Sequence, residues 1–223
     1  MAHPTSSIKI CGQTTLADAI LSADAGAGMV GVILFERSKR FVPFSEAVQW
    51  VGGIPAGVER VAVFVDPTFE EVRSALADGV FHSAQLHGRE SPELFAALNA
   101  AGFAGRLIKA LRVTDEASLE ALASFPTQRF LLDGPDPGSG RVFDWSLAAA
   151  AVRRHPEARF LLAGGLTPEN VASAVRAVGP HGVDVASGVE ERPGVKDPAR
   201  LRSFVAAARE ALAEMPAEQT GHA

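Results

Sequence analysis

Residues 159–190 read RFLLAGGLTPENVASAVRAVGPHGVDVASGVE, a pattern of strand, helix and strand. Two short apolar runs, residues 159–163 and 183–186, are typical of buried strands. Between them, Thr167-Pro168 has the form of a helix start, with threonine as the N-cap and proline in the first turn. Apolar residues then recur at helical spacing as far as Val178, so this stretch predicts one β-α-β unit.

Small residues follow both predicted strands of this unit. Gly164 and Gly165 come after the first strand, and Ser187 and Gly188 come after the second. Glycine lets the backbone approach a ligand closely, and free backbone amides in such loops favour an anion. Two ordinary glycine turns are the alternative, but the loops after strands 7 and 8 of a βα barrel frequently bind phosphate. Two such loops, one βα unit apart, therefore favour a phosphate site.

The same alternation of strand and helix patterns extends over the rest of the chain. The predicted strands are residues 8–11, 29–34, 60–65, 81–86, 106–111, 129–132, 159–163 and 183–186. The predicted helices are residues 16–25, 45–52, 68–76, 91–100, 115–124, 145–154, 168–178 and 198–215. This order predicts the α/β class and a single (β/α)8 TIM barrel over residues 1–215, followed by a disordered tail over 216–223. A doubly wound open sheet is the alternative, although the sequence has no dinucleotide fingerprint.

Three of the predicted helices carry clear N-terminal signals. Thr68-Phe69-Glu70-Glu71 has the form of a capping box. Ser91-Pro92 and Asp197-Pro198 each combine an N-cap residue with a proline at the first helical position. These signals indicate where the third, fourth and eighth helices begin.

Composition narrows the class of protein. The 223 residues are 47% hydrophobic and 21% charged, which is ordinary for a globular chain, and no apolar run reaches the length of a membrane span. The net charge of −5 argues against a nucleic-acid surface. The single cysteine excludes an internal disulfide, and the histidines show no metal-binding spacing. We therefore expect a cytoplasmic monomer or homodimer with no cofactor, metal, nucleic acid or membrane partner.

Polar residues follow several predicted strands, at the end of the barrel where active sites lie. Cys11 follows the first strand, His87 the fourth and Asp133 the sixth, and Arg40 belongs to a cationic loop after the second. Each has an ordinary alternative as a core thiol, a helix cap, a turn residue or a solvated charge. A proton acceptor opposite a proton donor, beside a phosphate site, is what the ring-opening isomerisation of a phosphosugar requires.

Several short motifs are spread along the chain. They are Lys9-Ile10-Cys11-Gly12, Gln85-Leu86-His87-Gly88, Phe143-Asp144-Trp145, Ala163-Gly164-Gly165-Leu166, the run 184–190 and Pro193-Gly194-Val195-Lys196-Asp197. Any one of them alone is unspecific. Together they resemble the phosphoribosylanthranilate isomerase family of tryptophan biosynthesis, and the resemblance runs from Lys9 to about Phe204.

The resemblance implies an Amadori rearrangement of N-(5'-phosphoribosyl)anthranilate to 1-(2-carboxyphenylamino)-1-deoxyribulose 5-phosphate. Asp133 would be the general acid that opens the ribose ring, and Cys11 the general base that takes the C2' proton. Arg40 would hold the anthranilate carboxylate, and Asp184 and His87 would contact the substrate. The residues implied for phosphate binding are Gly138, Ser139, Gly140, Gly164, Gly165, Ser187 and Gly188.

Two loops depart from the family pattern, and two other functions stay open. Ser38-Lys39-Arg40 stands where the family often has Ser-Pro-Arg, and Pro137-Gly138-Ser139-Gly140 stands where Gly-Gly-Thr-Gly is usual. One alternative function is the sister aminoaldose isomerase of histidine biosynthesis, which usually has two aspartates as acid and base, so Cys11 argues against it. The other is a barrel that binds a phosphorylated ligand without turning it over.

Overall fold

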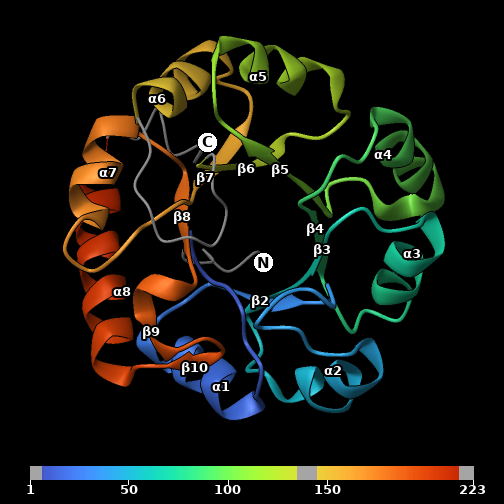
Figure 1. Cartoon of the computed structure of the whole chain (residues 1–223), viewed down its shortest axis with the longest axis horizontal. Coiled ribbons are helices and arrows are strands. Elements are labelled where there is room, and N and C mark those ends of the chain that lie inside the picture. The colour runs from blue at the N-terminus through green and yellow to red at the C-terminus, as the bar shows by residue number, and fades with distance from the viewer. Residues whose placement is uncertain (1–6, 135–144, 216–223) are drawn as a thin grey trace.

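The computed structural model describes residues 7–134 and 145–215, and its centre is a closed barrel of eight parallel strands (Figure 1). Each strand pairs with the next along the chain, and β1 closes the ring by pairing with β8. The barrel strands are β1 (Ile8–Ile10), β2 (Met29–Ile33), β3 (Glu59–Phe64), β4 (Ser83–Leu86), β5 (Leu107–Arg112), β6 (Arg129–Asp133), β7 (Arg159–Leu162) and β8 (Gly182–Val185). The predicted barrel is confirmed, and the open doubly wound sheet is wrong because the ring of strands has no edge.

Helices surround the barrel on its outer side (Figure 1). They are α1 (Leu16–Ala25), α2 (Phe44–Trp50), α3 (Phe69–Ala77), α4 (Pro92–Leu98), α5 (Glu116–Glu120), α6 (Trp145–Arg154), α7 (Val171–Val178) and α8 (Pro198–Ala213). Shorter helical turns are η1 (Val51–Gly53), η2 (Asn99–Phe103), η3 (Ala121–Ser124) and η4 (Ser187–Val189). None of the helices within residues 7–134 and 145–215 has the length and apolar character needed to cross a membrane.

Two apolar layers stabilise this arrangement. Successive strand residues point to opposite faces, so one set fills the barrel and the other packs against the helices. Val61, Ile108 and Leu131 belong to the inner set. Phe160 belongs to the outer set, in one cluster with Val175 of α7. Because both faces are buried, the strands are continuous apolar runs rather than alternating ones, which is why the sequence shows them clearly.

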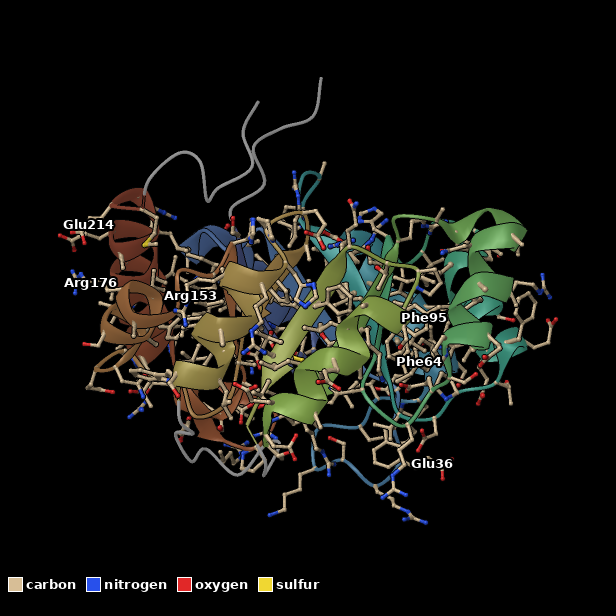
Figure 2. All side chains as sticks on the ribbon, turned by 90° about the horizontal axis from the view of Figure 1, so that it is seen from above. Glu36, Phe64, Phe95, Arg153, Arg176 and Glu214 are labelled. Carbon is tan, nitrogen blue, oxygen red and sulfur yellow. The ribbon has the colours of Figure 1, made fainter. Side chains whose placement is uncertain are left out.

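The two ends of the barrel carry different structures. In the side view, Glu36 in the loop after β2 extends beyond the end at which the strands terminate (Figure 2). Glu214, just beyond α8, lies toward the other end, where it pairs with Arg176 at 3.0 Å (Figure 2). Loops that follow the strands carry the functional residues of such barrels, so the Glu36 end is the functional end.

The start of α7 differs from the prediction. Thr167 was expected as its N-cap, but α7 begins at Val171 and Asn170 is the N-cap residue. The Asn170 side chain accepts a hydrogen bond from the Thr167 amide at 2.8 Å and donates one to the Gly165 carbonyl at 2.9 Å. The prediction was wrong because these bonds stabilise a turn over residues 167–170, which delays the helix by one turn.

A short hairpin follows β8 that the sequence patterns did not reveal. Its antiparallel strands are β9 (Glu190–Arg192) and β10 (Val195–Lys196). These strands are three and two residues long, too short for an alternating pattern to be recognised. The other predicted boundaries differ from the structure by a few residues, and the predicted tail over 216–223 lies outside the described residues.

The capping box of α3 is present as predicted. The Glu71 amide donates to Thr68 Oγ1 at 3.3 Å, and the Thr68 amide donates to Glu71 Oε2 at 2.7 Å. We expect Thr68→Ala to lower the free energy of unfolding by about 1 kcal/mol, measured by urea denaturation. Ser91→Ala is the control, because Ser91 is the N-cap of α4 but its side chain accepts no backbone hydrogen bond there. Equal losses in the two variants would contradict this account.

Candidate active site

Closure of the barrel places Lys9 of β1 beside Asp184 of β8. The two residues are register partners, and Lys9 Nζ donates to Asp184 Oδ1 at 2.8 Å. The Lys9 side chain is fully buried and that of Asp184 is 10% exposed. Burial alone would lower the pKa of Lys9, but the Asp184 carboxylate and the neighbouring Cys11 raise it above its usual value. Lys9 is therefore a buried cation at the base of the site, and its role was not predicted.

Cys11 follows β1 directly and is buried, with 6% of its surface exposed. Burial raises the pKa of its thiol, while the positive charges of Lys9 and Lys196 act in the opposite direction. A Cβ placed on Gly31 would lie 2.9 Å from Cys11 Sγ and 3.1 Å from Lys9 Nζ. The absence of a side chain at Gly31 thus leaves the space in which the thiol and the ammonium face each other.

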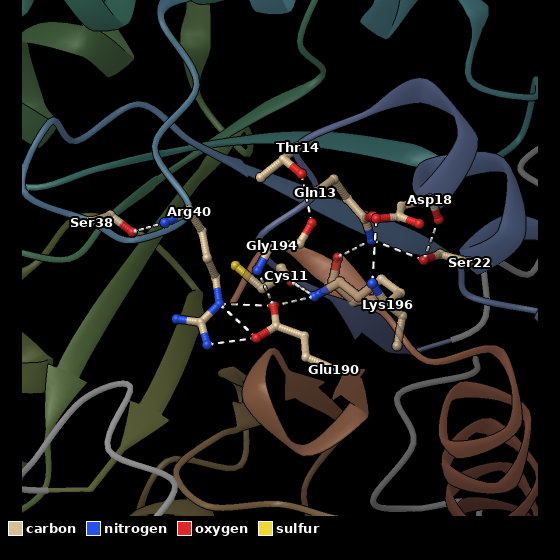
Figure 3. A network of polar contacts seen from close by, with 11 residues as sticks. Cys11, Gln13, Thr14, Asp18, Ser22, Ser38, Arg40, Glu190, Gly194 and Lys196 are labelled. Carbon is tan, nitrogen blue, oxygen red and sulfur yellow. Dashed lines mark hydrogen bonds and ion pairs between the residues drawn. The ribbon is translucent and has the colours of Figure 1, made fainter. Parts of the chain in front are cut away.

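Arg40 lies over this site and is held by Glu190, the first residue of β9 (Figure 3). Arg40 Nε donates to Glu190 Oε1 at 2.8 Å, and Arg40 Nη2 donates to Glu190 Oε2 at 2.7 Å. These hydrogen bonds raise the pKa of Arg40. Burial alone would raise the pKa of Glu190, but Arg40 and Lys196 bring it below its usual value. The predicted arginine therefore has a carboxylate partner that the sequence analysis missed.

Lys196 of β10 is the second buried lysine of the site (Figure 3). Its Nζ donates to the Cys11 carbonyl at 2.6 Å and to Glu190 Oε1 at 2.9 Å. Burial lowers the pKa of Lys196, and the Glu190 carboxylate opposes that effect. Lys196 and Glu190 both lie within motifs that carry the family resemblance, which was the one signal in the sequence that could have drawn attention to them.

Asp133 and His87 face each other at the barrel mouth, at the ends of β6 and β4. Asp133 ends β6, is 5% exposed, and its Oδ1 accepts a hydrogen bond from the Gly134 amide at 2.8 Å. Its Oδ2 lies 3.4 Å from His87 Nε2. Gln85 Nε2 lies 3.0 Å from the other ring nitrogen, His87 Nδ1, so the imidazole lies between Gln85 and Asp133. β7 and β8 separate Asp133 from Cys11 in the ring of strands.

The loops after β7 and β8 lie against each other. A Cβ on Gly188 would lie 1.9 Å from the Leu166 carbonyl oxygen, so these two backbones meet at a distance that only glycine permits. Gly164 and Gly165 adopt positive φ angles of 86° and 68° in the first loop. The structure thus brings together Gly164, Gly165, Ser187 and Gly188, whereas Gly138, Ser139 and Gly140 lie outside the described residues.

Comparison with known proteins decides the family. The family model of N-(5'-phosphoribosyl)anthranilate (PRA) isomerase matches residues 8–207. The chain belongs to this isomerase family. An N-(5'-phosphoribosyl)anthranilate isomerase of Pelobacter propionicus is 41% identical over 211 residues, which are 93% of this chain and 97% of the relative.

Solved structures of the family have the same fold. A crystal structure of phosphoribosyl anthranilate isomerase from Thermus thermophilus has a TM-score of 0.81 and 38% identity, and the match covers 90% of this chain and 96% of that one. A phosphoribosyl anthranilate isomerase in complex with reduced 1-(o-carboxyphenylamino)-1-deoxyribulose 5-phosphate has a TM-score of 0.79 and 36% identity, with coverage of 92% and 99%. The chain is accordingly an isomerase of tryptophan biosynthesis that converts N-(5'-phosphoribosyl)anthranilate to 1-(2-carboxyphenylamino)-1-deoxyribulose 5-phosphate.

Proposed function

We propose that Asp133 and Cys11 are the acid and the base of this isomerisation. The Asp133 carboxyl group donates a proton to the ribose ring oxygen, the bond from that oxygen to C1' breaks, and the anthranilate nitrogen forms a Schiff base with C1'. The Cys11 thiolate then takes the proton from C2', and the electron pair of that bond forms an enolamine. Movement of the enol proton to C1' yields the ketone, so no atom is gained or lost.

The observation that carries this proposal is the placement of the two groups at the mouth of one barrel. Cys11 follows β1 and Asp133 ends β6, so the two groups face the mouth from strands that β7 and β8 separate. Lys9 lies beside the thiol, and its positive charge favours the thiolate. His87 lies beside the carboxyl group, with its Nε2 3.4 Å from Asp133 Oδ2, and is proposed to contact the substrate near the ring oxygen that receives the proton.

Arg40 is proposed to bind the anthranilate carboxylate. Glu190 occupies Nε and Nη2 of its guanidinium group, and Nη1 points away from Glu190 without a hydrogen-bond partner among the described residues (Figure 3). Arginine keeps its charge and offers several donors, so Nη1 with the free face of Nη2 suits a second carboxylate. Asp184, which lies in β8 and pairs with Lys9, is proposed to contact the substrate near the ribose.

The two adjoining glycine loops are proposed to bind the phosphate group through backbone amides. We expect Gly188→Ala to separate them, because its Cβ would overlap the Leu166 carbonyl oxygen. The expected result is a KM raised about tenfold or more and weaker inhibition by inorganic phosphate. Gly52→Ala is the matched control, because a Cβ there meets nothing within 4 Å. An unchanged KM in Gly188→Ala would contradict the phosphate assignment.

A progress curve tests the proposed roles. Phosphoribosylanthranilate is generated in situ, the protein is added, and the loss of anthranilate fluorescence is followed for the wild type and for variants at Cys11 and Asp133. We expect turnover by the wild type alone, and none when the aminoaldose of histidine biosynthesis replaces the substrate. Full turnover by either variant would contradict that residue's role. The oligomeric state stays a prediction of monomer or homodimer, which light scattering measures.

A further inference from the structure

We propose that the β9–β10 hairpin is a positioning element, in which Lys196 stabilises the thiolate of Cys11 and Glu190 orients the guanidinium group of Arg40. Both residues act through others and are not catalytic. The inference rests on the proposed roles of Cys11 and Arg40, and it adds to them the two residues that couple the base to the carboxylate-binding group. It predicts that one short hairpin controls both proton abstraction and substrate binding.

Lys196 is buried, unlike an ordinary surface lysine. Its side chain has no exposed surface, and its ammonium group bonds to the Cys11 carbonyl and to Glu190 Oε1. Placing an ammonium group in the interior is unfavourable unless it is paired and hydrogen-bonded. Here one of its two partners is the backbone of the proposed base itself, so its charge acts on Cys11 at short range.

Positive charges near Cys11 oppose the effect of its burial. Among the described residues, the charged groups that face Cys11 directly or through a partner are the cations Lys9, Arg40 and Lys196 and the anions Asp18, Asp184 and Glu190. Burial raises the pKa of the Cys11 thiol, and Asp184 acts in the same direction. Lys9 and Lys196 act against both, so loss of the Lys196 charge would disfavour the thiolate further.

Glu190 joins the two functions because a single carboxylate serves both cations. Its Oε1 accepts from Arg40 Nε at 2.8 Å and from Lys196 Nζ at 2.9 Å, and its Oε2 accepts from Arg40 Nη2 at 2.7 Å. A fork of this kind fixes the plane of the guanidinium group. The hairpin is itself fixed, since Thr14 Oγ1 donates to the Gly194 carbonyl at 2.6 Å (Figure 3). The guanidinium group of Arg40 and the thiol of Cys11 are therefore held in a fixed relative position.

The Lys196 half of the proposal is tested by titrating Cys11 directly. The sequence has a single cysteine and no tyrosine, so thiolate absorption in the ultraviolet, read against Cys11→Ala, reports Cys11 alone. In Lys196→Met we expect the midpoint of the Cys11 titration to rise by about one pH unit, because a nearby positive charge is lost. Lys196→Arg keeps the charge and should keep the midpoint within a few tenths of a unit, even if Lys196→Met does not fold.

The matched control is Lys109→Met. Lys109 is also buried, pairs with Glu90 at 2.5 Å and donates to the Gly88 carbonyl at 2.9 Å. The Lys109→Met variant should lose thermal stability as Lys196→Met does, but the midpoint of the Cys11 titration should stay unchanged. A midpoint unchanged in Lys196→Met, or raised equally in Lys109→Met or in Lys196→Arg, would overturn the proposal. This readout needs no turnover, so it is independent of whether Cys11 is the base.

The Glu190 half is tested by separating KM from kcat. We expect Glu190→Gln to raise KM about tenfold with a smaller change in kcat, since losing one charge-assisted hydrogen bond has about this effect. An unchanged KM in folded Glu190→Gln would overturn this half of the proposal. If Arg40→Met left KM unchanged, the assignment of Arg40 in the proposed function would fail instead, so the two failures are distinguishable.

Discussion

Cys11→Ala is expected to lower kcat by about 10³-fold, because positioned general bases contribute about 10²- to 10⁴-fold. The thiol lies beside Lys9 at the end of β1, where the positive charge of Lys9 acts on it. The fold should persist, since the change removes a single sulfur atom from a site where Cys11 is 6% exposed. Steady-state kinetics and a thermal unfolding curve measure the two quantities.

The pH dependence of the wild type provides an independent check on this role. Burial raises the pKa of Cys11 above that of an ordinary thiol, so the protonated form predominates at neutral pH. The ionised form is the one that takes a proton and the one that reacts with alkylating agents, so the rate of Cys11 alkylation by iodoacetamide is expected to rise with pH through the neutral range and to level off above the pKa of Cys11. Wild-type rates in folded Cys11→Ala, or an alkylation rate that falls over this range, would contradict the assignment.

Asp133→Asn is expected to lower kcat by about 10²- to 10⁴-fold with little loss of stability. An asparagine oxygen can still accept the hydrogen bond that the Gly134 amide makes to Asp133 Oδ1, so the local backbone should stay in place. The amide cannot donate a proton to the ring oxygen, and only the transition state loses an interaction. Single-turnover and steady-state assays measure the effect.

A matched substitution separates chemistry from structure. Asp66→Asn changes a second aspartate whose carboxylate accepts a backbone hydrogen bond, from the Arg89 amide. Asp66 has a φ of 51°, a conformation that asparagine also tolerates. We expect near wild-type kcat for Asp66→Asn. A kcat loss as large as that of Asp133→Asn would indicate that loop structure, and not acid catalysis, explains both.

The sequence patterns predicted where the barrel strands end. They did not predict which side chains pair with the residues at those ends. Cys11, His87 and Asp133 were found because each directly follows an apolar run, and a parallel barrel gathers such positions at one end. Lys9 was not predicted as a site residue because it lies inside a strand pattern. Its partner Asp184 is 175 residues away, so no local pattern connects the two. Thr167 was misassigned because the side chain of Asn170 stabilises a turn that helix signals do not describe.

The sequence by itself determined the order of the elements. Its apolar periods indicate the eight barrel strands and the eight helices but not the β9–β10 hairpin, and its small residues mark the loops after β7 and β8, because periodicity and turn chemistry depend on neighbouring residues. Only the tertiary structure decided which charges meet. Arg40 pairs with Glu190 across 150 residues, and Lys196 reaches the carbonyl of Cys11 across 185. Such contacts depend on closure of the barrel by β1 and β8, and burial makes those few pairings obligatory.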